Sequence, residues 1–112
     1  MVDARDTFEM EGSIGTTKAG LTNNTVPANK FVRKVYSWLL NNNGSAVSGI
    51  TFTIEKGSTV VRTLPEIIVG AYDTISEQNA LGLITIPAGH SLKAQVTTGS
   101  GPVSVILRAF DL

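Results

Sequence analysis

Apolar residues from position 30 onward occur in short runs, and residues that favour turns separate these runs. In the clearest run, Ile50–Glu55, three large apolar side chains alternate with Thr51, Thr53 and Glu55. Side chains of a strand point alternately to its two faces, so this alternation predicts a strand with one face buried and one face in water. The whole pattern predicts seven or eight strands, and those beyond the leader span 30–40, 50–55, 59–64, 67–69, 83–86, 91–98 and 103–110.

The segment Lys30–Leu40 fits two interpretations. Four of its apolar residues have the spacing of a helix face: Phe31, Val35, Trp38 and Leu39. Its content of valine and aromatic residues favours an extended backbone instead, and we interpret it as a long strand. The strand would present one shared face made of Val32, Tyr36, Trp38 and Leu40.

Residues 1–29 form a polar leader rich in glycine and asparagine. It predicts a partly extended N-terminal arm with at most one short strand, at Ser13–Thr17, and a disordered terminus is the alternative. One helical turn is expected at Asp73–Leu81, where Thr74 and Glu77 have the spacing of a capping box. The predicted fold class is therefore all-β: residues 30–112 form a single-domain antiparallel β-sandwich or jelly roll with at most one short helix.

The composition of the chain excludes several classes of function. The chain has 112 residues, the length of one domain, and its lack of cysteine excludes a disulfide scaffold, a thiolate metal site and a cysteine nucleophile. Nine basic and nine acidic side chains give zero net charge, which removes the attraction that nucleic-acid and polybasic membrane binders use. Charged residues make up 16% of the chain, against about 25% in an average domain, and a charge-poor surface favours association.

Candidate catalytic groups are few. His90 is the single histidine, and it lies in a predicted turn where a solvent-facing ring is expected. The acidic residues are spread singly, so their spacing shows neither an acid and base pair nor a set of metal ligands. The Gly99–Gly101 turn lacks the following Lys-Ser/Thr of a phosphate-binding loop. We therefore predict that the protein is not an enzyme and holds no metal or cofactor.

The cations Lys30, Arg33 and Lys34 lie near aromatic residues, which is the one neighbourhood that suits nucleic acid. Three cations on a neutral domain are a weak footprint, and we interpret them as protection of a sheet edge or as an ion pair between subunits. No run approaches the roughly 20 apolar residues of a membrane span, and the N-terminus lacks the pattern of a targeting signal. Neither nucleic acid nor a membrane is a predicted partner.

The surplus of apolar residues is the feature that most needs explanation. The runs 31–40, 67–69 and 103–110 are apolar on both faces, whereas a sandwich of this size covers one face of most strands. Self-association would cover the second face, and the alternative is that the arm or the helical turn buries it. The predicted interface with further copies or with a partner protein comprises Phe8, Met10, Ile14, Leu21, Phe31, Tyr36, Trp38, Ile106 and Phe110.

Two stretches carry a resemblance to a known group of proteins. Leu81–Leu92 contains a Pro-Ala-Gly-His-Ser-Leu turn, and an alternating strand, a Gly-Ser-Gly turn and the closing strand Val103–Phe110 follow it. Upstream, Arg33–Asn41 ends in Leu-Leu-Asn. Between Lys30 and Leu112 the chain resembles small structural proteins of tailed bacteriophage virions, such as decoration (cement), head-fibre or tail proteins.

This resemblance implies a non-enzymatic virion protein, made in the host cytoplasm, whose jelly roll trimerises and decorates the head lattice. Its partners would be copies of itself and the major capsid protein or another virion protein, with residues 1–29 docking on the capsid or a neighbour. A receptor- or glycan-binding module of a tail or head fibre is the alternative. That module would use the loops Asn41–Ser45 and Gly70–Asn79, with Tyr72 as a ring that stacks on sugars.

Overall fold

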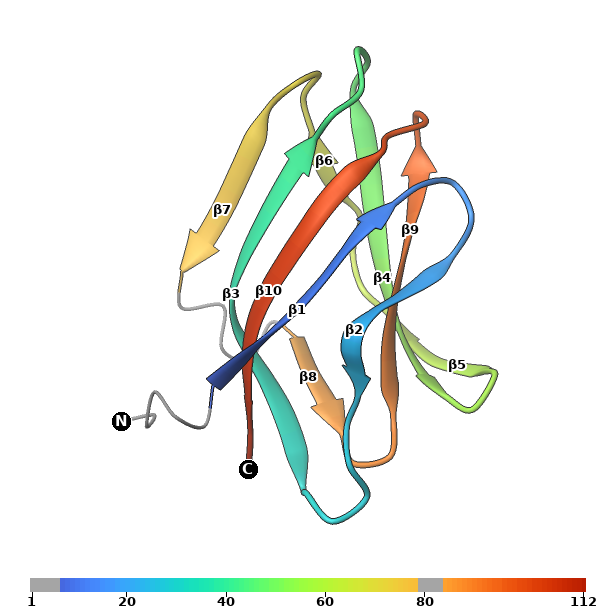
Figure 1. The fold of residues 1–112 in the computed structure, drawn as a ribbon. Coiled ribbons are helices and arrows are strands. Elements are labelled where there is room, and N and C mark those ends of the chain that lie inside the picture. The colour runs from blue at the N-terminus through green and yellow to red at the C-terminus, as the bar shows by residue number, and fades with distance from the viewer. Residues whose placement is uncertain (1–6, 79–83) are drawn as a thin grey trace.

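The computed structural model describes residues 7–78 and 84–112, and every regular element in these ranges is a β-strand. The strands are β1 (Thr7–Ile14), β2 (Ala19–Thr25), β3 (Val32–Asn42), β4 (Ser48–Lys56), β5 (Thr59–Thr63), β6 (Ile67–Val69), β7 (Thr74–Gln78), β8 (Ile84–Pro87), β9 (Ser91–Thr98) and β10 (Val103–Asp111). They form two antiparallel sheets stacked as layers (Figure 1), which confirms the predicted all-β sandwich. Among the described residues, no helix is long and apolar enough to cross a membrane.

The connectivity of the two sheets is that of a jelly roll. Sheet A has the order β1-β10-β3-β7, with β8 also paired to β3, and sheet B has the order β2-β9-β4-β5, with β6 also paired to β4. β7 and β8 pair with successive parts of β3, and β5 and β6 with successive parts of β4, so each pair fills one edge position. Counted as eight positions, the sheets read 1-8-3-6 and 2-7-4-5, the arrangement of two Greek keys.

The core lies between the sheets and follows the alternation of the sequence. β10 buries Val103, Val105, Leu107 and Ala109 on its inner face, and β4 buries the predicted trio of Ile50, Phe52 and Ile54. Burying each valine, leucine, isoleucine or phenylalanine side chain contributes about 1.5 to 3 kcal/mol to folding. The alternating segments therefore fix which face of each strand points inward.

Two sequence predictions differ from the structure. The leader, expected to hold at most a short strand, supplies both β1 and β2 from residues 7–25, because its side chains Met10, Ile14 and Leu21 complete the core. The helical turn expected at 73–81 is wrong in its described part, since β7 extends over Thr74–Gln78 and its Ile75 pairs in register with Leu40 of β3. Residues 79–81 of that prediction lie outside the described ranges.

Candidate interaction surface

The outer faces of the two sheets differ in chemistry. On sheet B, the outward positions of β4 and β9 are mainly polar, with Thr51 opposite Gln95 and Thr53 opposite Lys93. On sheet A, Leu39 of β3 stands opposite Ile106 of β10, and both point away from the buried Leu40 and Leu107. An apolar centre facing solvent is unusual for a sheet that already covers a core on its other side, so the outer face of sheet A is the candidate interaction surface.

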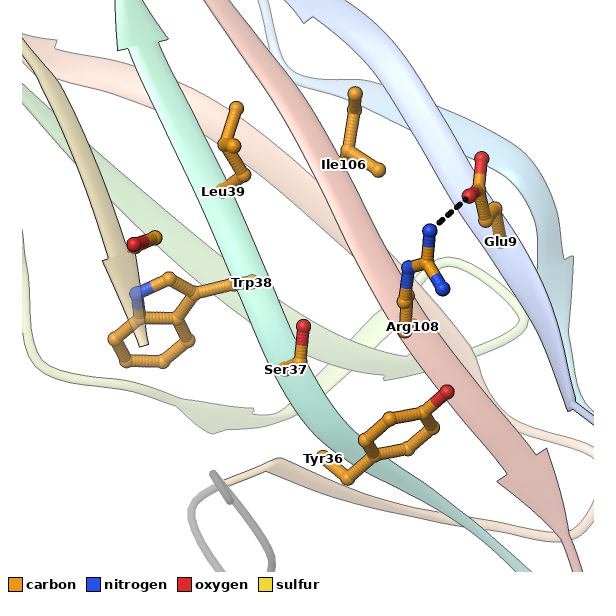
Figure 2. A pocket seen from close by; sticks show the side chains of 8 residues that line it. Glu9, Tyr36, Ser37, Trp38, Leu39, Ile106 and Arg108 are labelled. Atoms are coloured by element: carbon orange, nitrogen blue, oxygen red, sulfur yellow. Dashed lines mark ion pairs between the residues drawn. The ribbon is translucent and has the colours of Figure 1, made fainter. Parts of the chain in front are cut away.

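A groove runs across this face. It has a volume of about 410 Å³, and its lining comprises Glu9, Tyr36, Ser37, Trp38, Leu39, Ser76, Ile106 and Arg108. Figure 2 shows Leu39 and Ile106 on neighbouring strands, and Trp38 extending toward β7 at the edge of the groove. A second hollow of about 350 Å³ shares Ile106 and continues over β1 to Glu11. We call these two connected depressions the sheet A hollow.

Charged groups border the apolar floor of the sheet A hollow on the β1 side. Arg108 Nη2 lies 3.2 Å from Glu9 Oε1, and about half of each side chain is exposed (Figure 2). Glu11 is the next outward residue of β1 and is exposed as well. This border therefore carries two carboxylates for one guanidinium. An apolar centre with a polar rim is the usual anatomy of a protein interface.

A β-bulge brings an aromatic ring onto this face. Arg108 pairs with Ser37 and Ala109 with Val35, so Tyr36 has no residue opposite it on β10. The bulge turns Tyr36 outward, and its ring lies against Phe110 with 5.9 Å between the ring centroids. The predicted shared face of β3 is therefore wrong, because Val32 and Tyr36 lie on the side opposite to Trp38 and the buried Leu40.

The predicted interface residues divide into three groups. Met10, Ile14 and Leu21 are fully buried in the subunit's own core, and Phe110 is 8% exposed beneath Tyr36. The half-buried Tyr36 and Ile106 line the sheet A hollow, whereas Trp38 borders the hollow but packs against the subunit's own core. Phe31 is 86% exposed at the end of the sandwich. The side chain of Phe8 lies outside the described part of the structure.

Sequence reasoning missed Leu39, Glu9 and Arg108 as members of this surface. The alternation rule contains the signal for Leu39, since a residue between Trp38 and Leu40 on a strand must face the other way. No sequence signal joins Glu9 to Arg108, because their proximity results from the pairing of β1 with β10.

The edges of the sheets are protected against the addition of another strand. On β1, the Glu11 backbone N–H donates to Thr22 Oγ1 (3.0 Å), and the Asn23 side-chain amide donates to the Glu9 carbonyl (3.2 Å). On β5, a β-bulge at Val61 interrupts the register with β4. Covered backbone groups and bulges both discourage edge-to-edge pairing, so the face of sheet A is the more accessible binding surface.

The titratable groups of sheet B act as structural cross-links. Glu55 is buried, with Lys18 Nζ 2.8 Å from Oε2, Lys93 Nζ 3.7 Å from Oε1 and a hydrogen bond from Thr53 Oγ1. The hydrogen bond from Lys18 lowers the pKa of Glu55, against the opposing effect of burial, so the carboxylate is ionised at neutral pH. In the described ranges, no three histidine, aspartate or glutamate side chains gather into a metal site.

A buried amide organises the loops at one end of the sandwich. Asn42 Nδ2 donates to the carbonyls of Ala46 (2.8 Å) and Val69 (3.1 Å), and Asn42 Oδ1 accepts from the Gly44 N–H (2.9 Å). The Tyr72 N–H donates to the Gly44 carbonyl (3.1 Å), and Tyr72 has a φ of 54°, in the left-handed region that non-glycine residues seldom adopt. The network thus holds an aromatic ring that is 72% exposed.

Known proteins share this fold. No protein-family model matches the chain, and no curated protein sequence matches it. Among solved structures, it is similar to a protein of the acid-stable capsid of the Helicobacter pylori bacteriophage KHP30, with a TM-score of 0.52, 12% identity, and coverage of 95% of this chain and 86% of that one. A protein of the Bacillus endospore appendages, which are disulfide-linked pili, matches with a TM-score of 0.51, 14% identity, and coverage of 96% and 86%. The chain therefore has a jelly-roll sandwich fold that occurs in both proteins.

Proposed function

We propose that this protein is a structural subunit of a bacteriophage virion and that it works as a capsid decoration (cement) protein. In this proposal it assembles as a homotrimer and binds the major capsid protein or another virion protein. In this role the protein stabilises a lattice by covering apolar surface, and it catalyses no reaction.

The solvent-facing apolar centre of sheet A carries this proposal. Leu39, Ile106 and Tyr36 lie in a hollow that residues 7–78 and 84–112 leave open, and a partner that excluded water from them would gain about 25 cal/mol for each Å² of apolar area buried. Aromatic residues and arginine are enriched at the centres of interfaces, and this hollow contains Tyr36 and Arg108.

The composition and the fold support the same interpretation. A chain with zero net charge and 16% charged residues has little electrostatic repulsion to oppose association. The jelly roll is a frequent fold of viral capsid domains, and a phage capsid protein is among the solved structures with this fold.

Size-exclusion chromatography with multi-angle light scattering tests the self-association. We expect a species of about 35 kDa, three times the 11.8 kDa of one chain, at micromolar concentration. A Leu39→Glu variant should elute near 11.8 kDa, because a charge in the hollow opposes its burial. A Thr51→Glu variant, which places the same charge on the outer face of sheet B, is the matched control. A wild-type chain that stays at 11.8 kDa at 100 micromolar contradicts the proposal.

Binding to particles tests the decoration role. Phage particles are isolated from cells whose genome encodes the protein, and their small surface proteins are stripped off. Purified protein should then co-sediment with these stripped particles. Electron micrographs of re-decorated particles should show added density at regular lattice positions. Association with tail tips alone would exclude decoration of the head.

Receptor or glycan binding is a second candidate, favoured by the exposed Tyr72. The backbone of Tyr72 is held by a hydrogen bond to Gly44 of the neighbouring loop, so both loops of the predicted site meet at one end of the sandwich. Glycan-array signal from the wild type that disappears in Tyr72→Ala would support this function. Binding only to assembled capsids would exclude it.

A further inference from the structure

Phe31 is the most exposed large apolar side chain among the described residues, at 86%, yet its backbone is firmly held. Its N–H donates to the Leu112 carbonyl (2.8 Å), and its carbonyl accepts from the Ala88 N–H (3.1 Å). The Leu112 N–H also donates to the Val32 carbonyl (2.9 Å). The ring therefore projects from a fixed position at the end of β3, next to the exposed side chain of Lys30. Because the backbone is already held, binding would have to order only the side-chain torsions of Phe31, which limits the loss of entropy.

The sheet A hollow has the complementary shape and charge. Its floor contains Leu39 and Ile106, which suit an aromatic ring, and its β1 border carries the carboxylates of Glu9 and Glu11. Arg108 already pairs with Glu9, so the border has one carboxylate in excess, and a ring with one neighbouring lysine matches this floor and this charge. Two hollows placed face to face would instead leave a void between them, because both surfaces are concave.

The ring cannot reach the hollow of its own subunit. Phe31 and Leu39 lie eight positions apart along the extended segment that becomes β3, which separates them by about 26 Å at about 3.3 Å per residue. Insertion of Phe31 into a hollow therefore requires a second copy of the chain. The exposed β4–β5 hairpin is the competing candidate for insertion into the hollow, and its large apolar side chains are valines. Because valine is under-represented among the residues that dominate binding energy, Phe31 is the better anchor.

We propose that Phe31 of one copy inserts into the sheet A hollow of a second copy, with Lys30 beside the Glu9 and Glu11 carboxylates. This contact joins two different regions of the subunit, the end of the sandwich on one copy and the outer face of sheet A on the next, so it is a head-to-tail contact. Such contacts close into rings when the rotation between neighbours allows it, and three copies would give the trimer. The inference rests on the self-association in the proposed function and names the surfaces that carry it.

Removal of the ring tests the contact. Phe31→Ala should keep the far-ultraviolet circular dichroism spectrum of the wild type, because the side chain is exposed, and should lower the mass in light scattering from about 35 kDa to 11.8 kDa. Tyr72→Ala is the matched control, since it removes another exposed aromatic ring at the opposite end of the sandwich, and it should keep the mass of the wild type.

Mixing two variants separates this contact from a face-to-face dimer. Phe31→Ala retains its hollow, and Leu39→Glu retains its Phe31, so an equimolar mixture should form a complex of about 24 kDa although each variant alone is a monomer. Ile106→Glu replaces Leu39→Glu if the latter does not fold. An oligomeric wild type whose mass is unchanged by Phe31→Ala overturns this inference and leaves the proposed function standing. A monomeric wild type overturns both.

Discussion

The buried ion pair between Arg33 and Asp111 offers the sharpest test of how the sandwich is held together. Arg33 is 4% exposed, and it binds Asp111 through two hydrogen bonds, Nε to Oδ1 at 2.6 Å and Nη2 to Oδ2 at 3.0 Å. Its Nη1 also donates to the Asn23 carbonyl. The pair thus joins β3 to the last residue of β10 and to β2, and Asp111→Ala would leave a buried guanidinium without its carboxylate.

The expected cost of Asp111→Ala is about 3 to 5 kcal/mol, the usual loss when one partner of a buried ion pair is removed. This is a large part of the roughly 5 to 15 kcal/mol by which a domain is stable. With a urea m-value of about 2 kcal/mol/M, the unfolding midpoint should fall by roughly 2 M. The double variant Arg33→Met with Asp111→Leu should lose less than Asp111→Ala alone, because no charge then remains buried.

Urea titration followed by the fluorescence of Trp38, the single tryptophan, measures these changes. The Phe31→Ala background keeps the measurement independent of self-association, which otherwise makes stability depend on concentration. The reasoning is refuted if Asp111→Ala costs less than about 1 kcal/mol. It is also refuted if the stability lost by the double variant equals the sum of the losses of Arg33→Met and Asp111→Leu made singly, which would mean that the two groups are not coupled.

Three further substitutions test other parts of the structure. Because its contact with Lys18 lowers the pKa of Glu55, the carboxylate stabilises the fold above its usual pKa near 4.5, and this stability disappears as the pH falls through the lowered value. The difference in unfolding free energy between the wild type and Glu55→Gln should therefore be largest at pH 7 and should shrink as the pH falls below 4.5; a constant difference contradicts this. Asn42→Leu should cost at least about 2 kcal/mol in urea titration, since it leaves buried carbonyls and an N–H without partners, and a loss below about 0.5 kcal/mol argues against the amide network. Gly99→Ala should lower the melting temperature by several degrees, because Gly99 has a φ of 73° and a Cβ there would collide with the Val47 carbonyl; an unchanged melting temperature would show that the turn relaxes freely.

Much of the sandwich was predictable because alternation is a local property of the chain. The strands around Ile50–Glu55 and 91–98 were recognised with the correct buried face, since each alternates apolar and polar residues without interruption. The leader was harder to interpret because its apolar residues are sparse. Met10, Ile14 and Leu21 become core residues only through the pairing of β1 with β10 and of β2 with β9.

The candidate surface was only partly predictable, for reasons that lie in tertiary contacts. Tyr36 faces outward because of a bulge, and nothing in its local sequence marks the extra residue. Phe110 is hidden by that same ring. Glu55 was placed on the wet face of its strand, and it is buried because lysines from two other segments cover it. In each case, burial depends on neighbours that are distant in sequence.

Cysteine cross-linking between copies tests the head-to-tail contact most directly, because the natural chain contains no cysteine. A variant that carries both Lys30→Cys and Glu11→Cys keeps Phe31 and Leu39, and it should form disulfide-linked dimers and trimers under mild oxidation, whereas either single substitution should stay monomeric on a denaturing gel. Cross-linking of Glu11→Cys alone would mean that sheet A packs against sheet A, and an uncross-linked double variant at concentrations where the wild type is oligomeric would contradict the insertion of Phe31 into the hollow.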